Sequence, residues 1–340
     1  MKHTKNWGVI LSALLLMGSI LLACSSQTGD EKKAVDSAHT PTNQPNTLST
    51  SSQTATNTET TASALRKFTD YKGHTLEIPV TPQRIVFWGE TFSDLLTLNV
   101  NVVGTAHMFT KGSMYEHQMS QIQDIGFPIN LEKTLELKPD LIITASTDEK
   151  EYEQLSKIAP TIVFDTFEPL ENRIKLLGDI LGKKQEAEQW ITAFNMKTKE
   201  MWKQLHEAGI KPGETASVLT YYPGDRLFVM ARAGLPQMLY DPDGFKPTAK
   251  IQDVLDSNKG FEQISIELLH EFAGDRIFIL TPHDDESKRS TEEMMKSAIW
   301  TNLPAVKQGH VYTVEIDKAD SDALSRQWLL DELPKLLLKK

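Results

Sequence analysis

The stretch NLEKTLELKPDLIITASTDEKEYEQLSKIAPTIVFDTFE, residues 130–168, alternates between helical and extended patterns. An amphipathic segment precedes the apolar run LIITA, a charged segment follows it, and a second apolar run, TIVF, comes next. Short apolar strands separated by helical segments are typical of a mostly parallel sheet covered by helices. This stretch therefore predicts an α/β fold.

The same alternation continues on both sides of this stretch. Upstream, Lys72 and Gly73 turn a hairpin, and the strands RIVFW and VNVVGTA flank a short helix at 92–96. Beyond residue 209 the pattern resumes with TASVLTYY, DRLFVMARAG, RIFIL and GHVYTVEID, and it closes with the helix SRQWLLDELPKLLL. Because 340 residues exceed the usual size of a single core, we expect two lobes.

The segment between these halves carries one long helical pattern that no strand interrupts. We predict two Rossmann-like α/β lobes bridged by one long α-helix. The predicted boundaries are 65–168 for the N-terminal lobe, 169–208 for the bridging helix and 209–340 for the C-terminal lobe.

The first residues have a different character. MKHTKNWGVILSALLLMGSILLA, residues 1–23, has a positive start, an apolar run and small residues at its end, which is the layout of a secretory signal. The alternative is a retained transmembrane anchor, because the run is just long enough to span a bilayer. Residues 24–64 are rich in Ser, Thr, Asn, Gln and Pro and predict a disordered tether.

Cys24 is the only cysteine, so the chain forms no internal disulfide and no cysteine-clustered zinc site. The sequence Leu-x-Ala-Cys resembles the lipobox of bacterial lipoproteins, in which the cysteine receives a diacylglyceryl group and becomes the first mature residue. The resemblance implies a lipid anchor at Cys24 on the extracytoplasmic face of the cell membrane, as on a Gram-positive cell surface.

Charge and motifs narrow the class of function. The formal net charge is −10, which makes the chain a poor partner for nucleic acids. The sequence holds no Gly-x-Ser-x-Gly elbow, His-Glu-x-x-His helix, P-loop or Gly-x-Gly-x-x-Gly turn, so an enzyme has little support. His107, His117 and His283 leave a zinc or manganese site open, although single histidines in loops are more often solvated.

Four segments carry a family resemblance: FTDYKGHTLEIPVTPQRIV (68–86), NLEKTLELKPDLIITAS (130–146), FEQISIELLHEFAGDRIFIL (261–280) and IWTNLPAVKQGHVYTVE (299–315). In order and spacing they resemble the solute-binding lipoproteins of iron-siderophore and cobalamin ABC importers. The resemblance implies the class III periplasmic-binding-protein fold and capture of a ferric siderophore, for which a hydroxamate or mixed type is favoured. It also implies delivery to a permease dimer powered by a separate ATPase, a monomer, and no resident cofactor. Haem and cobalamin remain alternative ligands.

A ligand of such a protein belongs between the lobes, outside the carboxyl ends of the strands. Trp88, Gly89 and Glu90 follow one strand, and Gly89 permits close approach of a ligand. Other strand ends deliver the remaining candidates: His107, Met108, Tyr221, Tyr222, Thr281 and His283. Because successive side chains of a strand point to opposite faces, only one of the two tyrosines should face the ligand. Haem would need an axial ligand, and Met108, Met230 and His107 are available.

Arginine supplies planar donors to the oxygen atoms of a siderophore. By resemblance, Arg232 and Arg326 are the candidates to reach the ligand, and Arg226 is a third; ordinary surface salt bridges are the alternative. The resemblance also assigns Glu132 and Glu267 to docking on the permease. Each is predicted to open a helix, where the helix dipole favours a carboxylate even without a partner.

Overall fold

The computed structural model describes residues 64–339. The predicted signal peptide, Cys24 and all of the predicted tether except residue 64 lie outside the described residues. No helix in 64–339 is both long enough and apolar enough to cross a membrane.

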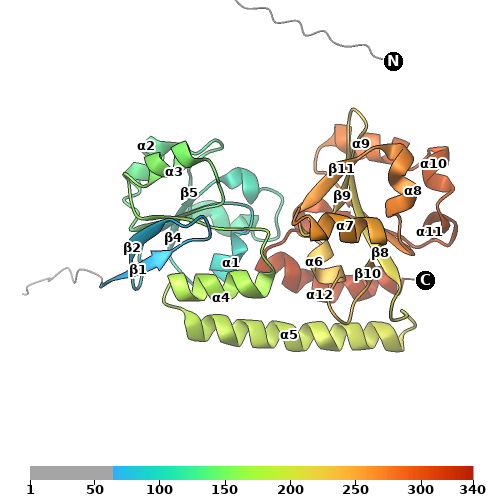
Figure 1. Cartoon of the computed structure of the whole chain (residues 1–340), viewed down its shortest axis with the longest axis horizontal. Coiled ribbons are helices and arrows are strands. Elements are labelled where there is room, and N and C mark those ends of the chain that lie inside the picture. The colour runs from blue at the N-terminus through green and yellow to red at the C-terminus, as the bar shows by residue number, and fades with distance from the viewer. Residues whose placement is uncertain (1–63, 340) are drawn as a thin grey trace, which may run out of the picture. The chain divides into compact units, whose positions relative to one another are not determined.

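The N-terminal lobe is built on a five-stranded parallel sheet with the order β5-β4-β3-β6-β7. Figure 1 shows this lobe in blue to green and the C-terminal lobe in yellow to red. Its strands are β3 (Ile85–Trp88), β4 (Val102–Thr105), β5 (Gln123–Asp124), β6 (Leu141–Thr144) and β7 (Thr161–Val163). An antiparallel hairpin, β1 (Leu65–Thr69) and β2 (Thr75–Pro79), precedes the sheet. All four residues of β6 are buried, as expected for a strand covered on both faces. The predicted parallel α/β architecture is confirmed.

Short helices connect these strands. They are α1 (Ser93–Leu96), α2 (Leu131–Glu136) and α3 (Glu149–Leu155), with the 3₁₀ turns η1 (His107–Phe109) and η2 (Glu116–Gln121). Side-chain caps fix two of the starts, because Asn130 accepts a hydrogen bond from the backbone of Lys133, and Asp148 accepts from Lys150 and Glu151.

The segment 169–208 is two helices rather than the one predicted. Helix α4 (Leu170–Ile180) ends before Gly182, and α5 (Lys184–Glu207) begins just after it. Gly182 has a φ of 69°, the left-handed conformation that ends many helices, and a Cβ there would lie 2.8 Å from the carbonyl oxygen of Val80. The prediction of a single 40-residue helix was therefore wrong, and the 24-residue α5 is the long connector.

The C-terminal lobe has a mixed sheet with the order β11-β9-β8-β12-β13, to which β10 adds beside β8. Its strands are β8 (Thr215–Tyr222), β9 (Arg226–Met230), β10 (Lys246–Pro247), β11 (Phe261–Ile264), β12 (Arg276–Thr281) and β13 (Val311–Glu315). The helical elements are α6 (Pro236–Leu239), α7 (Ala249–Asp256), η3 (Ile266–Leu268), α8 (Leu269–Phe272), α9 (Asp285–Met294), α10 (Ala298–Thr301), α11 (Pro304–Lys307), η4 (Ile316–Lys318) and α12 (Ala323–Leu337).

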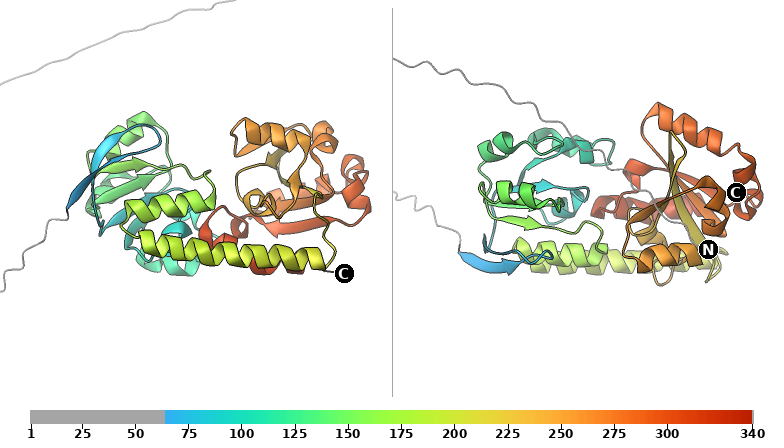
Figure 2. Two further views of the ribbon diagram at one scale, coloured as in Figure 1. Left: turned by 60° about the horizontal axis from the view of Figure 1, so that its bottom comes forward. Right: turned by 45° about the horizontal axis from the view of Figure 1, so that its top comes forward.

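Two helices join the cores of the lobes. The first turns of α5 place Ala187 and Ile191 in the N-terminal core, whereas its last turns place Trp202 in the C-terminal core. Figure 2 shows α5, in yellow-green, running alongside both lobes. Helix α12 does the same over a shorter distance, because Ala323 belongs to the N-terminal core and Leu329 to the C-terminal one. The start of α12 thus packs with the N-terminal lobe, although the predicted boundaries assign all residues after 208 to the C-terminal lobe.

Candidate functional site

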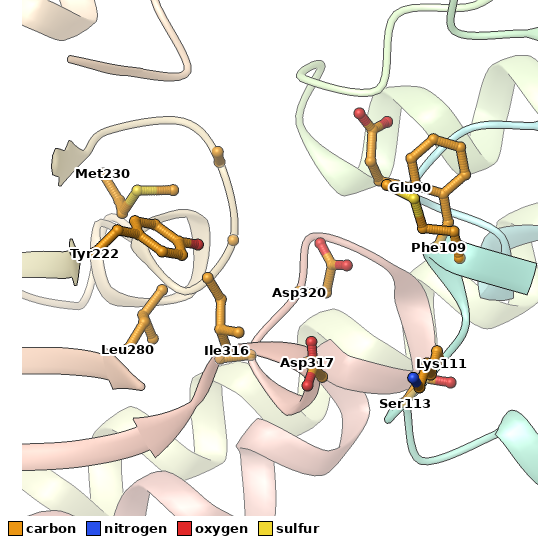
Figure 3. Close-up of a pocket in the computed structure, with 14 residues that line it drawn as sticks. Glu90, Phe109, Lys111, Ser113, Tyr222, Met230, Leu280, Ile316, Asp317 and Asp320 are labelled. Atoms are coloured by element: carbon orange, nitrogen blue, oxygen red, sulfur yellow. The ribbon is translucent and has the colours of Figure 1, made fainter. Parts of the chain in front are cut away.

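A cavity of about 300 Å³ lies between the two lobes. The N-terminal lobe contributes Glu90, Met108, Phe109, Lys111 and Ser113. The C-terminal lobe contributes Tyr222, Met230, Ala233, Gly234, Leu280, Ile316, Asp317, Ala319 and Asp320. Figure 3 shows Tyr222, Met230 and Leu280 on one side, Glu90 and Phe109 on the other, and Asp317 and Asp320 between them. We call this space the cleft cavity.

The cleft cavity lies at the carboxyl ends of the strands, where the sequence places the cleft. Glu90 follows β3, Met108 follows β4, Tyr222 is the last residue of β8, and Ile316 follows β13. These positions put side chains from several strands around one space, the usual arrangement of ligand sites in open α/β sheets.

The two consecutive tyrosines point to opposite faces of β8. Tyr222 lines the cleft cavity, and its ring packs edge-on against Phe228 with centroids 6.0 Å apart. Tyr221 is buried in the core, where its hydroxyl donates a hydrogen bond of 2.7 Å to Asp225. Burial raises the pKa of Tyr221 to about 12. Of the two candidates, only Tyr222 is placed to meet a ligand.

Trp88 supports the wall of the cleft cavity without lining it. Its ring stacks on Phe127 at 5.5 Å and meets Phe109 edge-on at 5.1 Å, and its indole nitrogen donates to the carbonyl of Gly126. Phe109 is the member of this aromatic group that lines the cavity. Gly89 was expected to permit close approach of a ligand. Packing against Ala145 is another reason for a glycine here, because a Cβ at residue 89 would lie 3.0 Å from the Cβ of Ala145.

The candidates that follow β4 and those at the end of β12 also differ in whether they line the cavity. Met108 lines the cavity, whereas the Nε2 atom of His107 donates to the carbonyl oxygen of Ile122 at 2.9 Å. Thr281 donates to the carbonyl of Val314, and the exposed His283 lies 3.4 Å from a carboxylate oxygen of the lining residue Asp317. His107, Thr281 and His283 are therefore near the cavity but do not line it.

Neither of the two preferred arginines reaches the cleft cavity. Arg326 is 1% exposed and donates to the carbonyl of Gly234 and to the side chain of Gln237, and burial lowers its pKa to about 9. Arg232 donates to Asn258 and, at 3.0 Å, to the carbonyl of Phe167 in the other lobe. Their role as ligand contacts stays a prediction, and the structure places both guanidinium groups against neighbouring protein groups rather than on the lining of the cleft cavity.

Arg232 and Arg326 instead border a second cavity of about 450 Å³, which residues of α4 and α5 also line. The third candidate, Arg226, is exposed, and its guanidinium lies 5.3 Å from the centroid of the Tyr222 ring. It contacts a lining residue of the cleft cavity from outside.

The lining of the cleft cavity is acidic. Glu90, Asp317 and Asp320 contribute carboxylates, and Lys111 is the single basic lining residue in the described part of the chain. Burial, with the nearby charges of Asp322 and Glu90, raises the pKa of Asp320 to about 7. Burial also raises the pKa of Asp317. Glu90 is predictable at a strand end, but no sequence motif assigns a role to Glu90, Asp317 or Asp320.

Near the cleft cavity lies an ion network formed by Asp94, Tyr115, Arg173, Asp322 and Arg326, here called the interlobe ion network. Asp322 and Arg326 are close enough to influence the lining residue Asp320. Arg173 donates to Asp94 at 2.8 Å, and both side chains are fully buried. The hydroxyl of Tyr115 donates to Asp322, the residue that caps α12. These contacts tie α1, α4 and α12 together across the lobes.

The predicted docking glutamates lie on the surface, one on each lobe. Glu132 is exposed in the first turn of α2. Glu267 is exposed in η3, a 3₁₀ turn that leads into the four-residue α8, so the helix expected there is short. A hydrogen bond from Ser265 lowers the pKa of Glu267, which keeps this carboxylate ionised. In residues 64–339 no three His, Cys, Asp or Glu side chains group as a metal site, so His107, His117 and His283 do not gather.

Residues 91–317 match the sequence pattern of the periplasmic binding protein family. The chain belongs to this family. Its members are substrate-binding proteins rather than enzymes, which agrees with the two-lobed fold and the cavity between the lobes. The predicted family and fold class are thereby confirmed.

Individual relatives agree with this assignment. The iron(3+)-hydroxamate-binding protein YxeB of Bacillus subtilis is 30% identical over 289 residues, 81% of this chain and 86% of the relative. The probable siderophore-binding lipoprotein YfiY of the same species is 26% identical over 305 residues, 85% of this chain and 93% of the relative. The solved structure of the FhuD protein from S. pseudintermedius superposes with a TM-score of 0.72 at 26% identity, covering 82% of this chain and 99% of that one.

Proposed function

We propose that this family member is the solute-binding component of an ABC importer and captures a ferric hydroxamate siderophore in the cleft cavity. The chelate then passes to a permease dimer that a separate ATPase drives. Iron enters as part of the chelate and is cargo, so the protein needs no resident cofactor and performs no covalent chemistry on its ligand. One monomer binds one ferric siderophore.

The observation that carries this proposal is the lining of the cleft cavity. Tyr222 and Phe109 offer aromatic surface from opposite lobes, and Met108 and Met230 add polarizable apolar contacts. A ferric hydroxamate presents apolar arms around an oxygen-coordinated iron and carries little negative charge. Ferric catecholates and citrates are anionic, and an acidic lining without arginine disfavours them.

A fluorescence titration of the full-length protein in detergent tests the proposal. Trp88 contacts the lining residue Phe109, so a bound ferric chelate should quench tryptophan emission in a saturable way. We expect quenching by ferric trihydroxamates and weaker or no response to ferric catecholate and ferric citrate. Saturation only with haem, cobalamin or a free divalent metal would contradict the hydroxamate assignment.

Haem is the second candidate, because two thioethers face the cleft cavity. Met108 and Met230 both line it and could supply axial ligands, whereas the imidazole of the third candidate, His107, is occupied by Ile122. Against haem, its two negatively charged propionates would be repelled by the carboxylates of Glu90 and Asp320 in the same cavity. An absorption spectrum with a methionine-ligated haem after titration would favour this candidate over hydroxamates.

Lipidation at Cys24 is the proposed means of attachment to the extracytoplasmic face of the membrane, and YfiY, a relative, is named as a lipoprotein. Two acyl chains hold a protein at a membrane far more durably than one. The Cys24→Ser chain should be exported and released from the membrane fraction. Equal retention of the variant and the parent would remove this assignment.

Docking on the permease is proposed to use Glu132 and Glu267. Their exposed carboxylates lie on different lobes, which lets one protein contact both halves of a permease dimer. Changing both to Lys should abolish uptake of the ferric chelate and leave its affinity for the isolated protein unchanged. The exposed pair Glu200 and Lys203 on α5 provides a control, since Glu200→Lys should leave uptake intact. Full uptake by the double variant would disprove the docking role.

A further inference from the structure

The charges around the cleft cavity are unbalanced. Glu90, Asp317 and Asp320 line it, and Lys111 is the one basic side chain among its described lining residues. No acidic side chain in residues 64–339 lies within salt-bridge distance of Lys111, so the lysine does not neutralise a particular carboxylate. Asp317 is partly balanced by His283 at 3.4 Å. Asp320 feels the positive charge of the buried Arg326, but neither it nor Glu90 forms a salt bridge with a basic side chain in residues 64–339.

Glu90 has an atom that the protein leaves without a partner. Its Oε2 atom is buried and accepts no hydrogen bond from the described residues. An unsatisfied buried carboxylate oxygen is costly, and a charged donor in the cavity would remove that cost. The neighbouring Asp320 accepts one hydrogen bond, from the backbone of Ser321, which leaves its second oxygen available.

Glu90 and Asp320 come from distant segments of the chain and act on each other. Glu90 follows β3 of the N-terminal lobe, and Asp320 precedes α12 beside the C-terminal lobe. The charge of Glu90 is one of the causes that raise the pKa of Asp320, so the two carboxylates are close enough to repel. Both residues line the cleft cavity, and Figure 3 shows Asp320 near its centre and Glu90 at one side. A cation between them would relieve this repulsion.

We propose that Glu90 and Asp320 form a subsite for a protonated amine, so that the protein prefers ferric hydroxamates that carry a pendant positive charge. The inference rests on the proposed function and narrows its ligand class. The iron and its hydroxamate arms occupy the part of the cavity near Tyr222 and Met230. The ammonium group of the chelate donates to both carboxylates.

The test compares two chelates with the same iron coordination. One is the ferric complex of a linear trihydroxamate that ends in a primary amine, and the other is the same complex with that amine acetylated. The full-length protein should bind the amine form at least about tenfold more tightly, since a charge-assisted hydrogen bond is among the stronger polar contacts. Glu90→Gln and Asp320→Asn should each lower this ratio toward one.

Two controls separate the inference from a fault in folding and from failure of the proposed function. Glu200→Gln, an exposed carboxylate on α5, should keep the full ratio, and thermal unfolding of all three variants checks that they fold. Equal affinity of the parent for both chelates, or a ratio unchanged in both cavity variants, would overturn the inference while leaving hydroxamate binding in place. Failure of the parent to bind either chelate would instead overturn the proposed function, and the inference with it.

Discussion

The cleft cavity and the interlobe ion network lie next to each other and treat charge in opposite ways. In the network, every guanidinium meets carboxylate or carbonyl oxygens: Arg173 donates to Asp94, and Arg326 donates to Gly234. In the cavity, carboxylates of Glu90 and Asp320 face open space with no arginine on the lining. Arg173 and Arg326 join segments of the two lobes, whereas the acidic groups of the cavity are left for the ligand.

This difference follows from what each region must do. A charge buried permanently is tolerated only if its hydrogen-bonding groups are satisfied, and the five donors of a guanidinium can serve several acceptors at once. Arg173 does this with Asp94, Glu168 and Ser321, which belong to three separate segments. A binding surface, in contrast, must keep some hydrogen-bonding groups free until the ligand binds. Unpaired groups are therefore expected in the cavity and not behind it.

The largest effect should come from breaking the interlobe ion network. Arg173→Met leaves Asp94 buried without its partner, and such a change typically costs about 3 to 5 kcal/mol of the free energy of unfolding. Lys175→Met on the same helix removes an exposed pair with Glu171 and should cost about 0 to 1 kcal/mol. Urea denaturation of both variants makes the comparison. A cost for Arg173→Met as small as that of the control would show that the network does not stabilise the fold.

Substitutions on β8 should separate the cavity from the core. Tyr222→Ala removes aromatic surface from the cavity and should weaken binding of a ferric trihydroxamate about tenfold. Tyr221→Phe removes only the hydroxyl that donates to Asp225, so it should leave affinity unchanged and lower stability slightly. Isothermal titration of both variants measures the difference. Equal loss of affinity in the two would mean that the strand is oriented differently in the complex.

A smaller effect is expected from pH, and it concerns the cavity alone. Asp320 has its pKa raised to about 7 by burial and by Asp322 and Glu90, while Arg326 acts in the opposite direction. Below this value the carboxyl is protonated, and a cationic ligand must displace the proton to bind. Affinity for the amine-bearing chelate should therefore rise several-fold from about pH 6 to about pH 8.

The same titration has a consequence for stability with the opposite sign. Because the folded pKa of Asp320 lies above its unfolded value, the unfolded chain loses this proton first, and the contribution of Asp320 to stability falls as pH rises toward 7.

Asp320→Asn should flatten the pH dependence of affinity for the amine-bearing chelate. An affinity for the amine chelate that decreases with pH in the parent would contradict this assignment of charge.

Several features of the fold and site were predictable because their signals are local. The apolar runs LIIT and RIFIL mark buried strands, and the positions just after strands supplied Met108 and Tyr222. Alternation along β8 required one tyrosine to face each side, although the side itself depends on how β8 pairs with its neighbours. These inferences need only the period of the elements and the rule that sites form at strand ends.

Other features depend on contacts between distant segments. Arg173 occupies a position on the apolar stripe of α4 with Leu170, Ile174 and Leu177, and this position is a local signal of burial. Nothing local shows that Arg232 would reach Phe167 or that Arg326 would be enclosed by Gly234, because those partners lie 65 and 92 residues away. The break between α4 and α5 was missed because Gly182 is a weak stop signal until Val80 packs against it.

The position of iron in the complex tests the account most directly. A crystal of the protein with a ferric trihydroxamate, measured at the iron absorption edge, should give one anomalous peak in the cleft cavity between Tyr222 and Phe109. The second cavity, beside Arg232 and Phe194, should contain none. A peak beside Arg232 would instead mean that the arginines hold the ligand, and it would contradict the division of charge between the cavity and the interlobe ion network.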